Sequence, residues 1–441
     1  MNSLWPDWPR EEHPPLRGFH LTEVAIVGGG LTGLFCAVIL ARAGLKVMVL
    51  EARRMGQGAT IACTGGLSPV FSSAYQTSTA SVNPPAALAH WELLSGAFRD
   101  LPAFLKECAI AADFTPMDAS CYAYSPRTAE RLDALAKRLQ EAKIPVERST
   151  SGCLFPVDEA LLARQQGRIR TPALVEGLMR AARESGCILC ENSPVRDISG
   201  TTLRTDTGQI GFSAAILATG VPITLRDRRV LSLLRPVGKI AARMSPMHGD
   251  TLMVPVSPDG LMVTPFPDAW MTGWQMGPPG RDHTPEMARF ERILHARLPE
   301  HTREGSILRQ DVHTADGLPL IGPLSHRDSH LLMASGYNGS GILHAFAAAR
   351  MLRRYLLDKP LPEDAFFHPL WRRAAPSPEN LLLRAGRRMF SAGSAPRCTH
   401  MGCRLKWDDA AGRWECPCHG SSFTRQGEVI TGPATQDIRR I

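Results

Sequence analysis

The sequence predicts an α/β fold followed by a small C-terminal β module, and three observations carry this prediction. Near the N-terminus, a glycine cluster and an apolar stretch stand between two short apolar runs, as in a β-α-β unit. Near the C-terminus, four of the eleven cysteines fall within 21 residues. The chain has 441 residues, of which 44% are hydrophobic and 21% charged, so it is long enough for two or three domains.

The composition excludes several classes of protein. Ordinary hydrophobic and charged fractions exclude a disordered or collagen-like chain. The sequence contains no run of eighteen apolar residues, so we expect no membrane span. The proline-rich first 18 residues lack the apolar core of a signal peptide, and we therefore expect a cytoplasmic location. Eleven cysteines without a secretion signal favour metal or redox chemistry over a disulfide scaffold.

The net charge of +8 is concentrated at the C-terminus. Residues 371–441 contain 12 Lys and Arg against 6 Asp and Glu, which places +6 there. A basic segment is typical of a solvated surface, of a site for an acidic partner or of a nucleic-acid site. Because no nucleic-acid motif accompanies these charges, we expect no nucleic-acid partner.

The N-terminal β-α-β unit carries a dinucleotide-binding pattern. A buried parallel strand is predicted at 24–27, an apolar helix ends at Gly44, and a second strand is predicted at 46–50. The turn between the first strand and the helix reads G-x-G-x-x-G. The second strand ends at Glu51, at the distance expected for an acidic residue that binds a ribose.

The residue type at each position of this pattern has a structural reason. Gly28 permits the tight turn, Gly30 lets backbone N–H groups approach a pyrophosphate, and Gly33 lets the helix pack on the strand. The helix N-terminus attracts the phosphates, and Glu51 can accept hydrogen bonds from the adenosine ribose. The pattern predicts a dinucleotide but does not separate FAD from NAD.

Motifs farther along the chain make that choice. They are Cys63-Thr-Gly-Gly66, Ala215-Ile-Leu-Ala-Thr-Gly220, Asp316-Gly-Leu-Pro-Leu-Ile-Gly-Pro323 and Gly336-Tyr-Asn-Gly-Ser-Gly341. Together with the glycine turn, they resemble the D-amino-acid-oxidase-like (glycine/sarcosine oxidase) family of FAD-dependent oxidoreductases over roughly residues 20–360. The resemblance implies FAD as the cofactor. It implies cofactor contacts from Gly28, Gly30, Leu31, Thr32, Gly33, Glu51, Ala52, Arg53, Gly58, Ala59, Thr60, Gly65, Gly66, Val195, Ala218, Thr219, Gly220, Gly336, Asn338, Gly339, Ser340, Gly341 and Ile342.

The resemblance also implies a threaded domain layout, because the FAD domain of that family is discontinuous. After a lead-in segment at 1–22, we expect a Rossmann-like FAD-binding domain interleaved with an antiparallel-sheet (α+β) substrate domain. The expected ranges are 23–75, 150–225 and 310–358 for the FAD-binding domain, 76–149 and 226–309 for the substrate domain, 359–396 for a linker and 397–441 for the small all-β module.

The C-terminal cluster has the spacing of a metal site. Cys398-x-His400 is followed by Cys416-x-x-His419. Two thiolates and two imidazoles can bind one zinc ion, or a [2Fe–2S] cluster with two Cys on one iron and two His on the other. A mixed Cys and His pair at both ends favours the Rieske arrangement, in which each loop gives one ligand to each iron. Structural zinc remains the alternative.

The sequences around these ligands resemble the loops of cytochrome-bc-type Rieske proteins. The resemblance implies a disulfide between Cys403 and Cys418 that pins the two cluster loops together. It also places a tyrosine at Phe423 in high-potential relatives. Because hydrogen bonds to sulfur stabilise the reduced cluster, we expect a potential in the middle or lower part of the Rieske range, about −150 to +300 mV.

The module is also shorter than a full Rieske domain. Only 26 residues separate Trp371 from Cys398, so we expect the module to be stabilised by packing against the main body of the protein. Between the two ligand pairs, Lys406-Trp407 and Trp414-Glu415 flank Asp-Asp-Ala-Ala-Gly, which predicts a hairpin.

Flavin and cluster together predict a function. Flavin accepts two electrons as hydride and a [2Fe–2S] cluster carries one, so the pair suits a dehydrogenase that oxidises a C–N bond of an amine or amino acid. A one-electron carrier such as ferredoxin or flavodoxin would take the electrons, and the basic C-terminal segment would suit an acidic partner. The candidate catalytic residues are Tyr337, His313 and Trp274, and Arg235, Lys239 and Arg243 are candidates to neutralise a substrate carboxylate.

Three alternatives stay open. A ferredoxin-like donor could reduce the cluster, then the flavin, then a substrate. The chain could be an oxygen-using amine oxidase whose metal site is structural. It could also be a non-catalytic redox sensor or assembly factor in which the cofactors only set the conformation.

Overall fold

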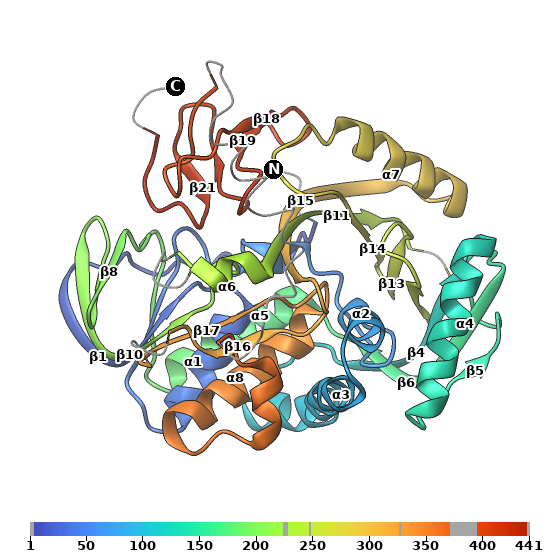
Figure 1. Ribbon diagram of the computed structural model, residues 1–441, viewed down its shortest axis with the longest axis horizontal. Helices are drawn as coiled ribbons and strands as arrows, with labels where there is room; N and C mark the ends of the chain where they lie inside the picture. Colours follow the sequence, from blue (N-terminus) through green and yellow to red (C-terminus); the bar gives the residue numbers. More distant parts are fainter. Residues whose placement is uncertain (1–3, 224–227, 247, 326–328, 371–394, 439–441) are drawn as a thin grey trace.

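The described residues of the chain form three β-sheets (Figure 1). The structure is a computed structural model that describes residues 4–223, 228–246, 248–325, 329–370 and 395–438. Most of the predicted linker at 359–396 therefore lies outside the described residues. A mainly parallel sheet occupies the left of the view, a larger mixed sheet the right, and the C-terminal module lies above both.

The first sheet has the order β16-β17-β10-β1-β2-β7, with β8 and β9 at the side of β10. Parallel pairing joins β1 to β10 and β2, β10 to β17, and β2 to β7. This is the predicted Rossmann-like α/β arrangement. The strands are β1 (Gly18–Val27), β2 (Val47–Leu50), β7 (Ile188–Cys190), β8 (Asp197–Ser199), β9 (Thr202–Arg204), β10 (Gly208–Leu217), β16 (Leu320–Pro323) and β17 (Leu331–Ser335).

Apolar helices cover one face of this sheet. α1 (Leu31–Arg42) is buried along nearly its whole length, because it packs between α5 (Thr171–Glu184) and α8 (Gly341–Leu357). The strand predicted at 24–27 is longer than expected: β1 starts at Gly18, so the end of the predicted lead-in belongs to the sheet. The earlier lead-in residues Leu4 and Trp5 are fully buried in the same core.

The second sheet has the order β15-β11-β14-β13-β12-β4-β6-β3, with β5 beside β6. It is antiparallel except where β12 pairs with β4. Its strands β3 and β6 come from ranges predicted for the FAD-binding domain, so the chain crosses between the sheets at points other than those expected. The strands are β3 (Gly66–Leu67), β4 (Thr115–Ala123), β5 (Glu147–Arg148), β6 (Glu159–Arg168), β11 (Leu234–Met244), β12 (Leu252–Pro255), β13 (Met262–Phe266), β14 (Ala269–Gln275) and β15 (Arg303–Thr314).

Helices flank the second sheet and bridge it to the first (Figure 1). α4 begins after Ser125, whose hydroxyl accepts a hydrogen bond from the Thr128 N–H as an N-cap. Among the described residues, none of the helices combines the length and apolar character needed to cross a bilayer. The remaining helices are η1 (Ala59–Ala62), α2 (Ser73–Ser81), α3 (Pro84–Glu107), α4 (Pro126–Glu141), α6 (Arg228–Leu233), α7 (Thr284–Arg297) and η2 (Pro362–Phe367).

The C-terminal module is a four-stranded antiparallel sheet. Its strands follow one another as β18 (Lys406–Asp408), β19 (Arg413–Glu415), β20 (Ser422–Phe423) and β21 (Val429–Thr431). The predicted hairpin is confirmed: β18 pairs with β19, and Trp407 faces Trp414. Cys398, Cys403 and Cys416 belong to a small buried core of the module, and Cys418 packs against it.

Candidate active site and metal centre

The glycine-rich turn after β1 is fixed by packing. Gly28 has a φ of +109°, and a Cβ added to it would lie 2.6 Å from the carbonyl oxygen of Ala218. A Cβ on Gly33 would lie 1.9 Å from the carbonyl oxygen of Gly28, so only glycine lets α1 approach the strand. Gly33 therefore acts in packing, as the motif predicts.

A cavity of about 480 Å³ opens at this turn, and we call it the cofactor cavity. It runs along the carboxyl ends of β1 and β2, where ligands bind in sheets of this kind. Most of the predicted cofactor contacts line it. They are Gly28, Gly30, Leu31, Thr32, Glu51, Ala52, Arg53, Gly58, Ala59, Thr60, Val195, Ala218, Thr219, Gly220, Gly336, Gly339 and Gly341.

Glu51 is oriented by the backbone around it. Its carboxylate accepts hydrogen bonds from the Gly29 N–H (2.8 Å) and the Arg53 N–H (3.0 Å). Burial raises the pKa of Glu51, and these two N–H groups oppose that rise. Each carboxylate oxygen keeps a lone pair for a further donor, so the residue fits the ribose hydroxyls of an adenosine.

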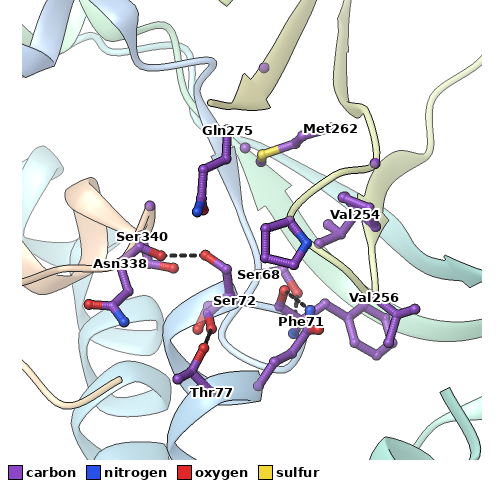
Figure 2. Close-up of a pocket in the computed structure, with 18 of the residues that line it drawn as sticks. Ser68, Phe71, Ser72, Thr77, Val254, Val256, Met262, Gln275, Asn338 and Ser340 are labelled. Atoms are coloured by element: carbon purple, nitrogen blue, oxygen red, sulfur yellow. Dashed lines mark hydrogen bonds between the residues drawn. The ribbon is translucent and has the colours of Figure 1, made fainter. Parts of the chain in front are cut away.

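A second cavity of about 500 Å³ adjoins the first, and we call it the substrate-side cavity. Figure 2 shows Met262 and Gln275 reaching into it from the second sheet, with Ser68, Phe71 and Ser72 opposite them. The predicted cofactor contacts Gly66, Asn338, Ser340 and Ile342 and the predicted catalytic residues Trp274 and His313 line this cavity.

Gly65 is not among the described residues that line either cavity. Its φ is +83°, and a Cβ there would lie 2.3 Å from the carbonyl oxygen of Ile169. The structure thus gives Gly65 a packing role, and its contact with the cofactor stays a prediction. The close approach of two backbones explains why glycine is required there.

The two cavities meet at a small junction. The residues that line both of them are Cys63, Lys239, Asp311, Gly339 and Gly341. The last two lie at the start of α8, so the positive end of the helix dipole faces the junction. A group held in the cofactor cavity would meet a substrate here.

Two side chains of opposite charge, Asp311 and Lys239, line the junction. Burial raises the pKa of Asp311, but His313 and Lys239 outweigh burial and bring it to about 2. The Asp311 carboxylate is therefore ionised at neutral pH, and its Oδ2 lies 3.7 Å from His313 Nε2. Lys239 is the one of the three predicted carboxylate-binding cations that lines the junction, since Arg243 pairs with Asp268 and Glu304.

The other two predicted catalytic residues have different surroundings. Tyr337 lines the cofactor cavity, where its ring stacks on His344 and its hydroxyl lies 3.1 Å from Thr32 Oγ1. Trp274 donates its indole N–H to the carbonyl oxygen of Asp259 and stacks on Phe290. These contacts hold both rings in the cavity walls, and their catalytic role stays a prediction.

The two predicted cluster loops have nearly the same backbone. In each six-residue loop, the N–H of the first residue donates to the carbonyl of the sixth: Cys398 to Cys403 (2.8 Å) and Cys416 to Ser421 (2.7 Å). In each loop the fifth residue, Gly402 or Gly420, has a positive φ. The loops therefore present their first cysteines in equivalent positions, as a site shared between two irons requires.

The four predicted ligands come together in the structure. The side chains of Cys398 and Cys416 lie next to each other, and the ring centroids of His400 and His419 lie 5.1 Å apart. Burial lowers the pKa of both histidines, to about 4 for His400, so the imidazoles are neutral, as ligands must be. Nδ1 of both rings and Nε2 of His400 are buried without a hydrogen-bond partner in the described chain. This donor set fits a Rieske cluster.

The second cysteine pair lies beside the ligands. Cys403 and Cys418 are free thiols in this structure. Their sulfur atoms and that of Cys416 lie within 4.8 Å of one another. The disulfide that the resemblance implies stays a prediction.

The cluster site adjoins the cofactor cavity. His419 lines that cavity, and a Cβ on Gly420 would lie 2.4 Å from Gln310 Oε1 on β15. Residues of the segment 428–437 also line the cavity. The sequence did not predict this contact or the place of Asp311 at the junction, because no motif marks them, whereas Lys239 was among the predicted carboxylate-binding cations.

Comparisons with known proteins agree with this geometry. Residues 23–355 match the DAO family, described as "FAD dependent oxidoreductase", and residues 379–441 match the Rieske [2Fe-2S] domain. The chain therefore belongs to the DAO family of FAD-dependent oxidoreductases and carries a C-terminal Rieske domain. These matches support FAD and a Rieske [2Fe–2S] cluster as its cofactors.

Individual relatives share one or both parts. A Bacillus subtilis protein, YhfW, named as a Rieske 2Fe-2S iron-sulfur protein, is 21% identical over 95% of this chain and 93% of its own length. The cytochrome b6-f complex iron-sulfur subunit of Chlorobaculum tepidum is 53% identical over 43 residues, which are 10% of this chain and 24% of that subunit.

Solved structures share the fold of the main body. Glycine oxidase from Geobacillus kaustophilus has a TM-score of 0.66 at 22% identity, covering 78% of this chain and 96% of that one. L-proline dehydrogenase from P. horikoshii has a TM-score of 0.65 at 16% identity, covering 81% and 98%. At these identities the likeness concerns the fold.

Proposed function

We propose that this chain is a dehydrogenase that oxidises a C–N bond of an amine or amino acid and passes the electrons through its Rieske cluster to an external one-electron acceptor. Bound FAD would supply the two-electron chemistry, because flavin accepts hydride. The acceptor would be a carrier of the ferredoxin or flavodoxin kind, for which the basic charge of residues 371–441 is suited.

One observation carries the proposal: the predicted cluster ligand His419 lines the cofactor cavity. An oxidase that hands electrons to dioxygen needs no such contact. Gly420 packs so closely on β15 that the cluster loop and the cavity wall leave no room for a side chain between them. One residue of the cavity wall, His419, thus belongs to a cluster loop, which supports electron transfer within the protein.

The junction residues suit an amino-acid substrate. Lys239 can pair with a carboxylate, and the ionised Asp311 can accept hydrogen bonds from the substrate nitrogen. Asp311 is a weak base because its pKa is about 2, so its role is to orient the nitrogen. The start of α8 would favour negative charge that develops beside it.

Anaerobic stopped-flow mixing of the holoprotein with glycine, sarcosine, proline and iminodiacetate tests the proposal. We expect one of these amines to bleach the flavin absorbance and to produce a reduced-cluster EPR signal in the same sample. Flavin that is reduced only by a reduced ferredoxin would reverse the proposed direction.

Asp311→Asn tests the junction. We expect flavin reduction to slow about 100-fold with unchanged flavin absorbance and cluster EPR, because the substrate nitrogen loses its charged acceptor. Glu304→Gln is the matched control, since Glu304 lies on the same strand and pairs with Arg243 at the surface. Equal rates of flavin reduction for the two variants would show that Asp311 does not orient the substrate.

A further inference from the structure

The cluster module supplies a wall of the cofactor cavity. Apart from His419, every module residue in that wall comes from the segment 428–437, which we call the cap segment. The cap segment contains β21 and the turn after it. Its lining residues are Glu428, Val429, Ile430, Thr431, Gly432, Ala434, Thr435 and Asp437.

The cap segment is held in shape by the cluster loops. The Ala434 N–H donates to Ser421 Oγ at 3.0 Å, and the carbonyl oxygen of Ser421 accepts a hydrogen bond from the N–H of the ligand Cys416 at 2.7 Å. The Val429 N–H donates to Asp437 Oδ1 at 2.8 Å and closes the turn on itself. The conformation of the cap segment therefore depends on the loops that hold the cluster.

The cap segment is also tied to the first sheet. Nη1 of Arg196, which lines the cofactor cavity, donates to the Thr435 carbonyl oxygen at 2.7 Å. The Asp206 carboxylate holds the same guanidinium from the other side. A Cβ on Gly432 would lie 3.3 Å from Ile223, in the loop after β10. The wall is thus closed by direct contact.

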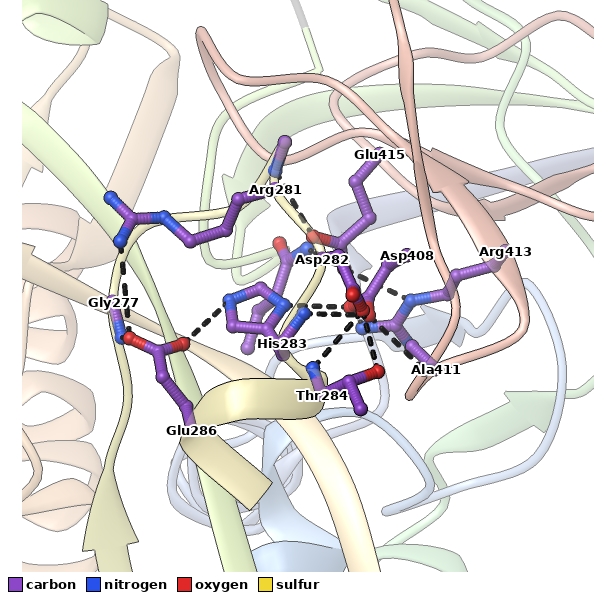
Figure 3. Close-up of polar contacts among 12 residues, drawn as sticks. Gly277, Arg281, Asp282, His283, Thr284, Glu286, Asp408, Ala411, Arg413 and Glu415 are labelled. Carbon is purple, nitrogen blue, oxygen red and sulfur yellow. Dashed lines mark hydrogen bonds and ion pairs between the residues drawn. The ribbon is translucent and has the colours of Figure 1, made fainter. Parts of the chain in front are cut away.

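A buried polar network secures the opposite edge of the module (Figure 3). His283 Nδ1 lies 2.7 Å from Asp408 Oδ2, and both side chains are almost fully buried. Glu415 accepts hydrogen bonds from the Gly280 N–H and from Gln310 Nε2, and it pairs with Arg413. Because a buried charge without its partner is costly, this network resists undocking of the module.

The same network explains a cluster of candidate metal ligands. His283, Asp408 and Glu415 lie close enough together to hold an ion. Their charges are already matched, since Arg413 pairs with Glu415 and His283 with Asp408. The group therefore fits a docking contact better than a second metal site.

We propose that the cap segment is part of the FAD site: it closes the cofactor cavity and retains FAD, so that the cluster module and FAD stabilise each other. A ligand that contacts two elements stabilises both, and the coupling between cluster binding and FAD binding is reciprocal. The inference concerns cofactor retention alone, so it holds for either direction of electron flow and for any substrate.

Ile430→Ala in the full-length holoprotein tests the proposal. Ile430 lines the cavity, whereas Ile438 packs on the module core and does not line it, so Ile438→Ala is the matched control. We measure FAD dissociation by the rise in flavin fluorescence after dilution. We expect Ile430→Ala to release FAD about tenfold faster, which corresponds to about 1.4 kcal/mol, and Ile438→Ala to release it at the wild-type rate.

The EPR signal of the reduced cluster reports whether each variant keeps its module folded. Equal release rates for Ile430→Ala and the wild type, with intact clusters, would overturn the proposal. Faster release from both variants would do the same, since it would reflect general loosening of the module.

Hydrogen exchange of the wild-type protein gives a second measurement that needs no variant. We compare protein stripped of FAD with protein reloaded with FAD and follow the amides of the cap segment. We expect FAD to slow exchange at Val429 and Ala434, whose N–H groups donate within the module. Exchange that FAD leaves unchanged there would show that the cap segment does not close over the cofactor.

Discussion

The FAD-binding region and the cluster module build their sites in opposite ways. The cofactor cavity draws on residues as far apart as Gly28 and Thr435, so it needs nearly the whole fold. The cluster ligands fall between Cys398 and His419, in two loops with matching backbones. A distributed site depends on long-range packing, whereas a local site depends on a short loop and its hydrogen bonds.

The cap segment is shared by the two regions. It belongs to the local module in sequence and to the distributed cavity in space. The coupling between the two cofactors is reciprocal, but its expected outcome differs because the cluster is held by four protein ligands. The comparison therefore predicts an asymmetry in occupancy: loss of FAD should leave the ligated cluster in place, whereas loss of the cluster should let FAD dissociate faster. The following variants test this asymmetry, from the largest expected effect to the smallest.

Gly33→Ala should abolish FAD binding while the cluster survives. The new Cβ would lie 1.9 Å from the Gly28 carbonyl oxygen, and such overpacking costs about 3 kcal/mol or more. FAD content and cluster EPR are measured on the same purified sample. Gly96→Ala is the control, since a Cβ there would meet only Arg99 Nη2, at an ordinary contact distance of 3.7 Å, and Gly96 is not among the residues that line either cavity. Loss of both cofactors from Gly33→Ala would argue against an autonomous cluster site.

Cys416→Ser should remove the cluster and leave FAD bound more weakly. Serine is a poor iron ligand, and the loop that ends at Ser421 loses the metal that orders it. Iron analysis should show no cluster, and FAD should dissociate faster than from the wild type. Unchanged FAD dissociation would separate the two sites and contradict the coupling.

His283→Gln should remove a pH-dependent part of the stability. Burial lowers the pKa of His283, but Asp408, with Glu415 and Glu286, outweighs burial and raises the pKa above its ordinary value. A raised pKa stabilises the folded protein below about pH 6.5, and this stability is lost as the pH rises through the folded-state pKa.

Thermal unfolding between about pH 6 and pH 9 measures this contribution. The wild type should lose stability with rising pH, and His283→Gln should show a flatter profile, because its side chain does not titrate. His301→Gln is the control, since the His301 ring hydrogen bonds with the Ser245 carbonyl oxygen and packs on Trp270. A wild-type profile from His283→Gln would remove this residue from the docking contact.

Phe423→Tyr should raise the reduction potential of the cluster by about 20 to 60 mV. A hydrogen bond contributes about 0.5–1.5 kcal/mol, and a tenfold change in a one-electron equilibrium corresponds to about 59 mV. Phe423 is fully buried in the module core, close to the ligand cysteines. A redox titration followed by EPR measures the shift, and a lower potential in the variant would contradict the assignment.

The sequence predicted the parts of each site that obey local rules. The glycine turn and Glu51 are recognisable because a strand, a turn and a helix must follow one another at set distances. The cluster ligands are recognisable for the same reason. The hairpin of Trp407 and Trp414 followed from the turn residues between them.

The rest depends on long-range pairing. Lys239 and Asp311 reach the junction because β11 and β15 pair with Val237 opposite Asp311, a register that no short motif encodes. The role of Gly65 depends on its approach to Ile169, a residue more than a hundred positions away. The cap segment reaches the cofactor cavity only through docking contacts such as that between Arg196 and Thr435.

The central claim is that FAD and the cluster exchange electrons inside one protein, and flash photoreduction of the flavin with freeze-quench EPR tests it most directly. The account predicts that the reduced Rieske signal, with its low average g value, appears as the reduced-flavin absorbance decays, at a rate independent of protein concentration. Reduced flavin that persists beside an oxidised cluster, a rate that scales with concentration, or an EPR-silent protein containing zinc would contradict it.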